Sequence, residues 1–252
     1  MLESASVMQD SVIGWNEIHD DSIRYQTSSN ILTFVDNLGF LYTSEFPCFD
    51  KIDVFQTKNI RLIVRTGVAM EETTCFSSHD DQNVICFPHS AFQFSKLNCT
   101  TFVSSFYSES NDRSSMFPNY ISNETSAEDN SNLHDQLIGL SVDNQTVKLE
   151  SSLVRLEFRH PEVDLAEAGR VCVWWDSAGL AWARAGCQFS EEESEATLTV
   201  CHCDHLTNFG VMFDYQGEAD PHHPVFTLLS TILLSLSALS ILVTQAFLAL
   251  TK

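Results

Sequence analysis

The residues best suited to metal binding or catalysis lie within seven positions, in the stretch CHCDHLT at 201–207. Cysteine, histidine and aspartate can bind a metal ion, and a histidine can act as a base in proton transfer. An alternating apolar segment follows directly, as is typical of a strand. The stretch is therefore a candidate for a metal site, a catalytic site or the last strand of a disulfide-bonded domain.

A zinc site in this stretch would use Cys201, His202, Cys203 and His205. Structural zinc sites separate paired cysteine ligands by about two to four residues, whereas a single residue separates Cys201 from Cys203. In an extracellular chain, a Cys-x-Cys pair is more typical of two disulfide ends that point the same way along a strand. We therefore expect no metal here, and the sequence indicates no cofactor.

Short apolar and aromatic runs separated by turn residues continue from residue 51 to residue 215. The run NIRLIVRTGVAM at 59–70 alternates in the manner of a half-buried strand, and no helix-period segment of useful length follows residue 50. Many short strands of this kind predict a mainly β fold, an antiparallel β-sandwich over 51–215. We expect residues 1–50 to be an N-terminal segment that includes the end of a truncated helical subdomain.

Four of the eight cysteines fall in predicted strands at the C-terminal end of the sandwich. Cys172 can face Cys201 across a small sheet, and Cys187 can face Cys203 in the same way. Two disulfides would stabilise a unit too small for a large core of its own. The remaining four allow three pairings between which the sequence does not decide; these are Cys48, Cys75, Cys86 and Cys99.

The segment VFTLLSTILLSLSALSILVTQAFLAL at 225–250 carries no charge over 26 residues. About 20 apolar residues cross a bilayer, so we predict a transmembrane helix here, preceded by a polar linker at 216–224. Acidic residues before the span and Lys252 after it predict an extracellular N-terminus. The predicted location is the plasma membrane, with a single pass in this chain and several in the presumed full protein.

Eight cysteines ahead of the span agree with an ectodomain that passes through the secretory pathway, as do three N-glycosylation sequons, at Asn98, Asn123 and Asn144. The net charge of −21 would repel phosphate backbones, so we expect no nucleic-acid partner. The N-terminal stretch MLESASVMQDSVIGWNEIHDD has neither the basic nor the apolar region of a signal peptide. We therefore expect the chain to be a fragment.

A series of landmark residues lies at the C-terminal end of the predicted sandwich. In order, they are Cys172-x-Trp174-Trp175, then Trp182, then Gly186-Cys187, and finally Cys201-x-Cys203-x-His205-Leu206-Thr207-x-Phe209. This order resembles the GPCR proteolysis site of adhesion G-protein-coupled receptors, the last part of that family's GAIN domain. The resemblance implies a proteolysis site at 170–215 and the disulfides Cys172–Cys201 and Cys187–Cys203, and we expect the three tryptophans in the core.

The resemblance further implies a self-cleavage reaction between Leu206 and Thr207. A threonine hydroxyl becomes nucleophilic when a neighbouring base removes its proton, and His205 is the expected base. Its ring can reach the Thr207 hydroxyl in a kinked turn, and Asp204 is a candidate for orienting the ring. Attack on the Leu206 carbonyl would give an ester that water hydrolyses. Because each chain would react only once, on itself, we do not expect this protein to be an enzyme that acts on an external substrate.

The segment TNFGVMFDY at 207–215 has two periodicities. Phe209, Val211 and Phe213 alternate as in a buried strand, whereas Phe209, Met212 and Phe213 share one face of a helical turn. The resemblance implies a core strand that acts as a tethered agonist when it leaves the sandwich. It also implies that the cleaved N-terminal fragment stays bound non-covalently and that the missing helices couple to a heterotrimeric G protein. The sequence does not indicate the extracellular ligand.

Two other classes of protein share some of these features. A polycystin-like channel subunit also carries this proteolysis site before its first membrane helix, and a single-span adhesion protein could use the domain structurally. The compact pattern of Phe209, Met212 and Phe213 favours the receptor. Sequence beyond Lys252 would discriminate, since a lipase-like sandwich is expected in polycystins and a second helix in receptors.

Overall fold

The computed structural model describes residues 2–3, 18–44, 51–67, 73–88, 100–107, 116–117, 131–133, 136–142, 154–161 and 168–215. Met1–Tyr215 forms one compact unit, and Gln216–Lys252 is grouped separately from it. Within the described ranges, no helix is long and apolar enough to cross a membrane. The linker and span predicted at 216–250 lie outside these ranges, as do the three sequon asparagines, Cys48 and Cys99.

The described part consists of a single long helix and thirteen strands. Every strand pair for which a register is given is antiparallel, so the predicted mainly β, antiparallel architecture is confirmed. In chain order the elements are α3 (Asp21–Ser44), β1 (Lys51–Gln56), β2 (Ile60–Gly67), β3 (Thr73–Ser77), β4 (Asn83–Pro88), β5 (Thr100–Tyr107), β6 (Ser131–Leu133), β7 (Leu137–Val142), β8 (Val154–Arg159), β9 (Ala168–Asp176), β10 (Ala181–Ala183), β11 (Cys187–Phe189), β12 (Leu198–Cys203) and β13 (Asn208–Tyr215).

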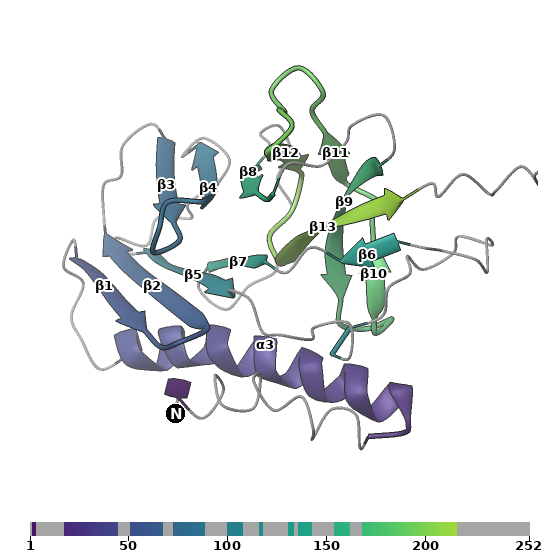
Figure 1. Cartoon of the computed structure of the whole chain (residues 1–252). Coiled ribbons are helices and arrows are strands. Elements are labelled where there is room, and N and C mark those ends of the chain that lie inside the picture. The colour runs from purple at the N-terminus through teal and green to yellow at the C-terminus, as the bar shows by residue number, and fades with distance from the viewer. Residues whose placement is uncertain are drawn as a thin grey trace, which may run out of the picture. The chain divides into compact units, whose positions relative to one another are not determined.

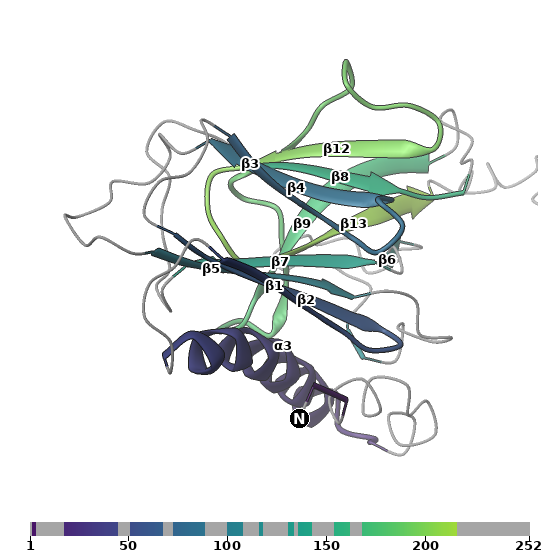
Figure 2. The same ribbon diagram turned by 90° about the vertical axis from the view of Figure 1, so that its left-hand side faces the viewer.

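The strands form two sheets that pack face to face. The larger sheet has eight strands in the order β1-β2-β5-β7-β13-β9-β10, with β6 pairing with β13 beside this path, and the smaller has the order β11-β12-β8-β4-β3. Helix α3 lies across the outer face of the larger sheet, as Figures 1 and 2 show. The molecule therefore has three layers, a helix, a large sheet and a small sheet.

Two hydrophobic cores separate these layers. The core between the sheets draws side chains from both of them, including Phe87 and Phe102, whose stacked rings lie 4.9 Å apart. The second core fills the space between α3 and the larger sheet, where Val35 of the helix is fully buried. The central strands of the larger sheet are therefore covered on both faces, whereas the edge strand β1 leaves Ile52 and Val54 exposed. This covering explains why β2, predicted to be half-buried, buries Ile63 as well as Leu62.

Helix α3 occupies 24 residues of the N-terminal segment 1–50, which we expected to include the end of a helical subdomain. Asp20 caps its start, since the Asp20 carboxylate accepts a hydrogen bond of 2.9 Å from the Ser22 backbone N–H. No proline interrupts residues 21–44. The buried side of the helix includes small residues, Ser28, Ser29 and Gly39, which allow close approach to the sheet.

A hydrogen-bonded carboxylate fixes α3 to the centre of the larger sheet. Asp36 accepts hydrogen bonds from the hydroxyl of Ser141 in β7 at 2.9 Å and from that of Ser105 in β5 at 3.4 Å. Withdrawal from solvent raises the pKa of Asp36 to about 7, although both hydrogen bonds act in the opposite direction. Part of the residue remains exposed, because Asp36 borders a cavity.

Replacing Gly39 by Ala should destabilise the fold, even though alanine is the better helix former. A Cβ atom at this position would lie 2.6 Å and 2.7 Å from the two methyl carbons of Val103 in β5. We expect the free energy of unfolding to fall by about 1–3 kcal/mol, measured by chemical denaturation. Val103→Ala removes both obstructing methyls, so Gly39→Ala should cost much less in that background. Equal costs in both backgrounds would contradict this contact.

Replacing Asp36 by Asn should stabilise the chain in a pH-dependent way. Because the folded pKa lies above the ordinary value of 3.8, the folded chain holds a proton that the unfolded chain releases. Stability contributed by this group therefore falls as the pH rises from about 4 to about 7. Asparagine can accept from one of the two hydroxyls through its amide oxygen and donate to the other through its NH2 group, without becoming charged.

We expect Asp36→Asn to raise the free energy of unfolding by about 1–3 kcal/mol at about pH 8 and by clearly less at about pH 5. Thermal unfolding at both pH values measures the difference. Asp53→Asn, in β1, is the control; this carboxylate forms an ion pair with Lys51 at 2.8 Å, so its removal should not stabilise the chain. A stabilisation by Asp36→Asn that is the same at both pH values would refute the buried-carboxylate explanation.

Candidate functional site

The turn at 204–207 carries the chain from one sheet to the other. It follows β12 of the smaller sheet and leads into β13, which lies between β7 and β9 in the larger one. Two backbone hydrogen bonds hold the turn, from Asp204 N to Gly186 O at 2.9 Å and from Leu140 N to Thr207 O at 3.1 Å. Leu206 is buried in the core between the sheets. The two ends of the turn are therefore attached to different sheets.

Gly186 is required for the geometry of the Asp204 side chain. Its φ of +86° is a left-handed conformation that favours glycine, and a Cβ here would lie 2.3 Å from Asp204 Oδ1. Any other residue would displace the Asp204 carboxylate. Gly186 is one of the sequence landmarks quoted above, but only the structure gives it this role.

The His205 ring is held by three neighbours. Its Nδ1 atom lies 2.8 Å from Asp204 Oδ1. Its ring packs edge-on against Trp174, with centroids 4.7 Å apart, and lies 5.7 Å from the Phe209 ring. A carboxylate only accepts hydrogen bonds, so the proton belongs on Nδ1, and Nε2 is then the basic nitrogen. The Nε2 atom is buried and has no hydrogen-bond partner.

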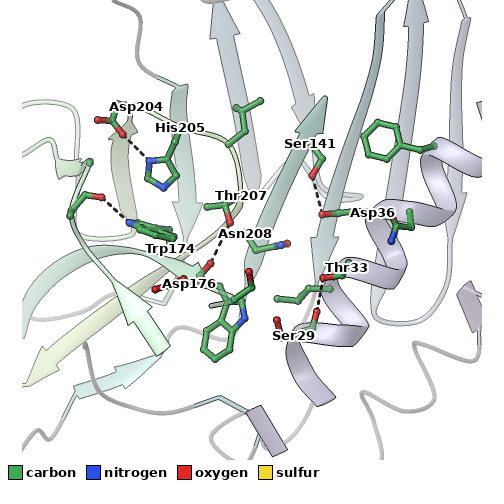
Figure 3. A pocket seen from close by; sticks show the side chains of 18 residues that line it. Ser29, Thr33, Asp36, Ser141, Trp174, Asp176, Asp204, His205, Thr207 and Asn208 are labelled. Carbon is green, nitrogen blue, oxygen red and sulfur yellow. Dashed lines mark hydrogen bonds and ion pairs between the residues drawn. The ribbon is translucent and has the colours of Figure 1, made fainter. Parts of the chain in front are cut away.

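The Thr207 hydroxyl does not form a hydrogen bond with His205. It donates instead to the Trp175 backbone carbonyl, over a long distance of 3.4 Å. From the sequence we expected the ring of His205 to reach this hydroxyl. Both residues lie on one cavity wall, but they are not in hydrogen-bond contact (Figure 3). A rotation of the Thr207 side chain is the smallest movement that could redirect the hydroxyl.

Disulfides surround the turn. Cys172 pairs with Cys201 and Cys187 with Cys203, the pairing that the resemblance implies. The setting differs from the small separate sheet that we expected, because Cys172 lies in the larger sheet and Cys201 in the smaller. The C-terminal strands are thus shared between the two sheets, and this disulfide joins the layers. A third disulfide, Cys75–Cys86, links β3 to β4.

The residues of the zinc alternative are engaged in other contacts. Cys201 and Cys203 are both disulfide-bonded and cannot act as thiolate ligands. His202 lies with its Nε2 atom 2.8 Å from Glu193 Oε1, on the strand beside the turn. In the described ranges, no group of three or more potential ligands is arranged to hold a metal ion.

The three landmark tryptophans have different environments. Trp182 is fully buried and Trp175 nearly so, both in the core beneath α3. Trp174 is only partly buried, which differs from the expected core position. Its indole N–H donates to the Ala185 carbonyl at 2.8 Å, which holds the ring against His205. Trp174 therefore belongs to the wall of the site.

Strand β13 is buried on both faces. Phe209, Val211 and Phe213 point into the core between the sheets, and Met212 points into the core beneath α3. The strand pairs with β9 over Phe209–Tyr215, with β7 at its start and with β6 near its end. The helical grouping of Phe209, Met212 and Phe213 is therefore split between two cores in this conformation.

A cavity of about 760 Å³ lies between α3 and the turn. Figure 3 shows Asp36 and Thr33 of the helix on one side and His205, Thr207 and Asn208 on the other. Sequence reasoning missed Asp36, although a single carboxylate within the apolar run ILTFVDNLGFLY was a usable signal. It also missed Asn208, a buried polar residue at the start of β13.

The GPS family model, described as GAIN subdomain B, matches residues 51–217. Adhesion G-protein coupled receptor G1 of Danio rerio is 31% identical over 150 residues, which cover 56% of this chain and 22% of that protein. Latrophilin-like protein 1 of Caenorhabditis elegans is 38% identical over 66 residues, covering 26% of this chain and 6% of that protein. Adhesion G-protein coupled receptor G2 of Rattus norvegicus is 31% identical over 97 residues, which cover 37% of this chain and 9% of that protein.

The aligned regions thus span at most 22% of the length of these relatives. The family match covers both sheets, the disulfide frame and the turn at 204–207. The chain therefore belongs to the GPS family, described as GAIN subdomain B, and resembles the adhesion G-protein-coupled receptors named above over this region.

Proposed function

We propose that this chain is the extracellular, self-cleaving domain of an adhesion-type G-protein-coupled receptor, and that it cuts its own bond between Leu206 and Thr207. The observation that carries this proposal is the hydrogen bond between His205 Nδ1 and Asp204. It leaves Nε2 unprotonated and without a partner, on the cavity wall that also contains Thr207. A base and a nucleophile are thereby available within one turn.

The first half of the reaction is an acyl shift from nitrogen to oxygen. His205 Nε2 takes the proton from the Thr207 hydroxyl, and the oxygen attacks the carbonyl carbon of Leu206. The bond from this carbon to the Thr207 nitrogen then breaks, and the nitrogen receives the proton from His205. The product is an ester between the Leu206 carboxyl group and the Thr207 side chain, with a free amine on Thr207.

The second half is hydrolysis of that ester. One water molecule supplies the hydroxyl of a new Leu206 carboxyl group, and the Thr207 oxygen regains a proton. The chain now ends at Leu206 and a second piece begins at Thr207. Nothing regenerates the bond, so the reaction is a single turnover within one molecule rather than an enzyme activity toward other substrates.

The pieces should stay together after the cut. All eight cysteines precede residue 207, so no disulfide can link the pieces. Strand β13 nevertheless has hydrogen-bonded neighbours on both edges, and Val211 and Met212 are fully buried. This burial favours non-covalent retention of the strand.

Release of β13 is the proposed signalling step. Outside the sheet, residues 207–215 can form a helical turn with Phe209, Met212 and Phe213 on one face. We infer that this segment is a tethered agonist for the membrane helices of the full receptor, which would couple to a heterotrimeric G protein. Residues 225–250 would be the first of those helices, in the plasma membrane.

The cleavage proposal predicts a defined new N-terminus. Material from the secretory pathway should contain a fragment that begins Thr207-Asn208-Phe209, detected by mass spectrometry or N-terminal sequencing. Thr207→Ala removes the nucleophile and should leave only intact chain, whereas Thr207→Ser retains a hydroxyl and should still be cut. Intact wild-type chain, in cells that cleave a control receptor, would overturn the proposal, as would cleavage of Thr207→Ala.

The proposed role of Asp204 can be tested separately. Asp204→Asn weakens the carboxylate contact that orients His205 and keeps its proton on Nδ1, so cleavage should slow by about 10- to 100-fold. A pulse-chase experiment measures this rate from the appearance of the Thr207 fragment. Asp176→Asn alters another carboxylate of the same cavity that does not bond His205, and its rate should remain near that of wild type. Equal rates for Asp204→Asn and wild type would exclude an orienting role.

A further inference from the structure

The cavity between α3 and the turn has the size and form of a ligand site. Its volume of about 760 Å³ lies within the range of about 300–1,000 Å³ that small-molecule pockets occupy. Apolar surface comes from Leu32 and Phe40 of the helix and from Trp174 and Leu206 on the opposite side. Polar groups project into it from both walls (Figure 3).

The charge of the described lining is entirely acidic apart from His205. Asp36 faces the cavity from α3, and Asp176 and Asp204 face it from the other wall, while the lining contains no Lys or Arg. Among the described residues, Asp36 accepts hydrogen bonds from the hydroxyls of Ser105 and Ser141. A carboxylate has about four acceptor positions, so Asp36 retains capacity for a cationic donor.

Three buried polar atoms of cavity-lining residues lack hydrogen-bond partners in the part of the chain that the structure describes; one is His205 Nε2, noted above. Asn208 is 7% exposed and its Oδ1 atom accepts no hydrogen bond; Trp175 is 3% exposed and its indole N–H donates none. Burying such groups without a partner is unfavourable, because they lose their hydrogen bonds to water. Figure 3 shows the Asn208 side chain extending across the cavity toward the Asp36 side. The cavity therefore offers two unused acceptors, Asn208 Oδ1 and His205 Nε2, and one unused donor, the Trp175 indole N–H, beside a carboxylate.

We propose that this cavity binds a small primary amine with an apolar body and a hydroxyl group. Its ammonium group lies between Asp36 and Asn208, and its hydroxyl oxygen accepts the hydrogen bond of Trp175. The apolar body packs on the indole and leucine surfaces of the walls. The chain's net charge of −21 favours the approach of such a cation. Binding of this ligand does not require the proposed cleavage.

The protonation state of Asp36 agrees with this assignment. Burial raises the pKa of this carboxyl to about 7 in the empty cavity. An ammonium group beside it would favour the charged form, so affinity should increase as the pH rises from about 6 to about 8. The other titratable groups on the walls are Asp176, Asp204 and His205.

Three related compounds test the chemistry on the full chain. Tyramine carries both the amine and the hydroxyl, phenethylamine lacks the hydroxyl, and tyrosol lacks the amine. Isothermal titration calorimetry at about pH 8 should show saturable binding of one tyramine per chain. Tyrosol should bind at least about ten-fold more weakly, and phenethylamine several-fold more weakly. No saturable tyramine binding, or equal affinity for tyramine and tyrosol, would overturn the proposal.

Variants of the protein then locate the site. Asp36→Asn should weaken tyramine binding by at least about ten-fold, and its thermal unfolding transition verifies that it is folded. Asp53→Asn removes a carboxylate of β1 that does not border the cavity and should bind like wild type. Undiminished binding to Asp36→Asn would also overturn the assignment. Titrating intact Thr207→Ala chain as well makes the outcome independent of whether the bond at 206–207 is cut.

Discussion

The burial of β13 in the centre of the larger sheet is the constraint on which the rest of the structure depends. The strand has β7 and β6 on one edge and β9 on the other, and its alternate side chains fill two different cores. Val211 and Met212, on opposite faces, are both fully buried. Removal of this strand would open both cores and split the larger sheet. Packing of its side chains into both cores therefore holds the strand in the sheet.

The turn before β13 receives its geometry from elements that are far apart in the sequence. Gly186 permits the approach of Asp204, which in turn bonds His205. The Cys172–Cys201 disulfide joins the two sheets close to where the chain crosses between them. These contacts fix the residues ahead of the proposed cut covalently and leave those after it held by burial and hydrogen bonds alone. The proposed cut would therefore separate a disulfide-linked scaffold from a strand that only non-covalent contacts hold.

Much of the sandwich could be predicted from local sequence patterns. Alternation identified β13, and the spacing of Cys201 and Cys203 pointed to disulfide ends on one side of a strand. Helix α3 was harder to locate, because it buries Ser28 and Ser29 while leaving Phe34 and Leu41 exposed, which blurs the helical period. Because this helix was hard to recognise, we also did not predict that a helix covers the second face of the larger sheet.

The finer features of the site depend on tertiary contacts that no local pattern contains. Asp36 bonds hydroxyls that lie 69 and 105 positions away in the chain. The spacing of His205 and Thr207 allowed their contact but did not determine the direction of the Thr207 hydroxyl, which bonds Trp175 instead. The partly exposed position of Trp174 likewise follows from the packing of His205 against its indole.

The central claim is that the cut separates β13 covalently from the scaffold while the folded sheet retains it. Native mass spectrometry of the purified chain tests both parts of this claim at once. We predict a complex with the mass of the intact chain plus one water molecule, which denaturation separates, without reduction, into residues 1–206 and 207–252. Two separate pieces under native conditions, or a single uncut chain after denaturation, would contradict the account.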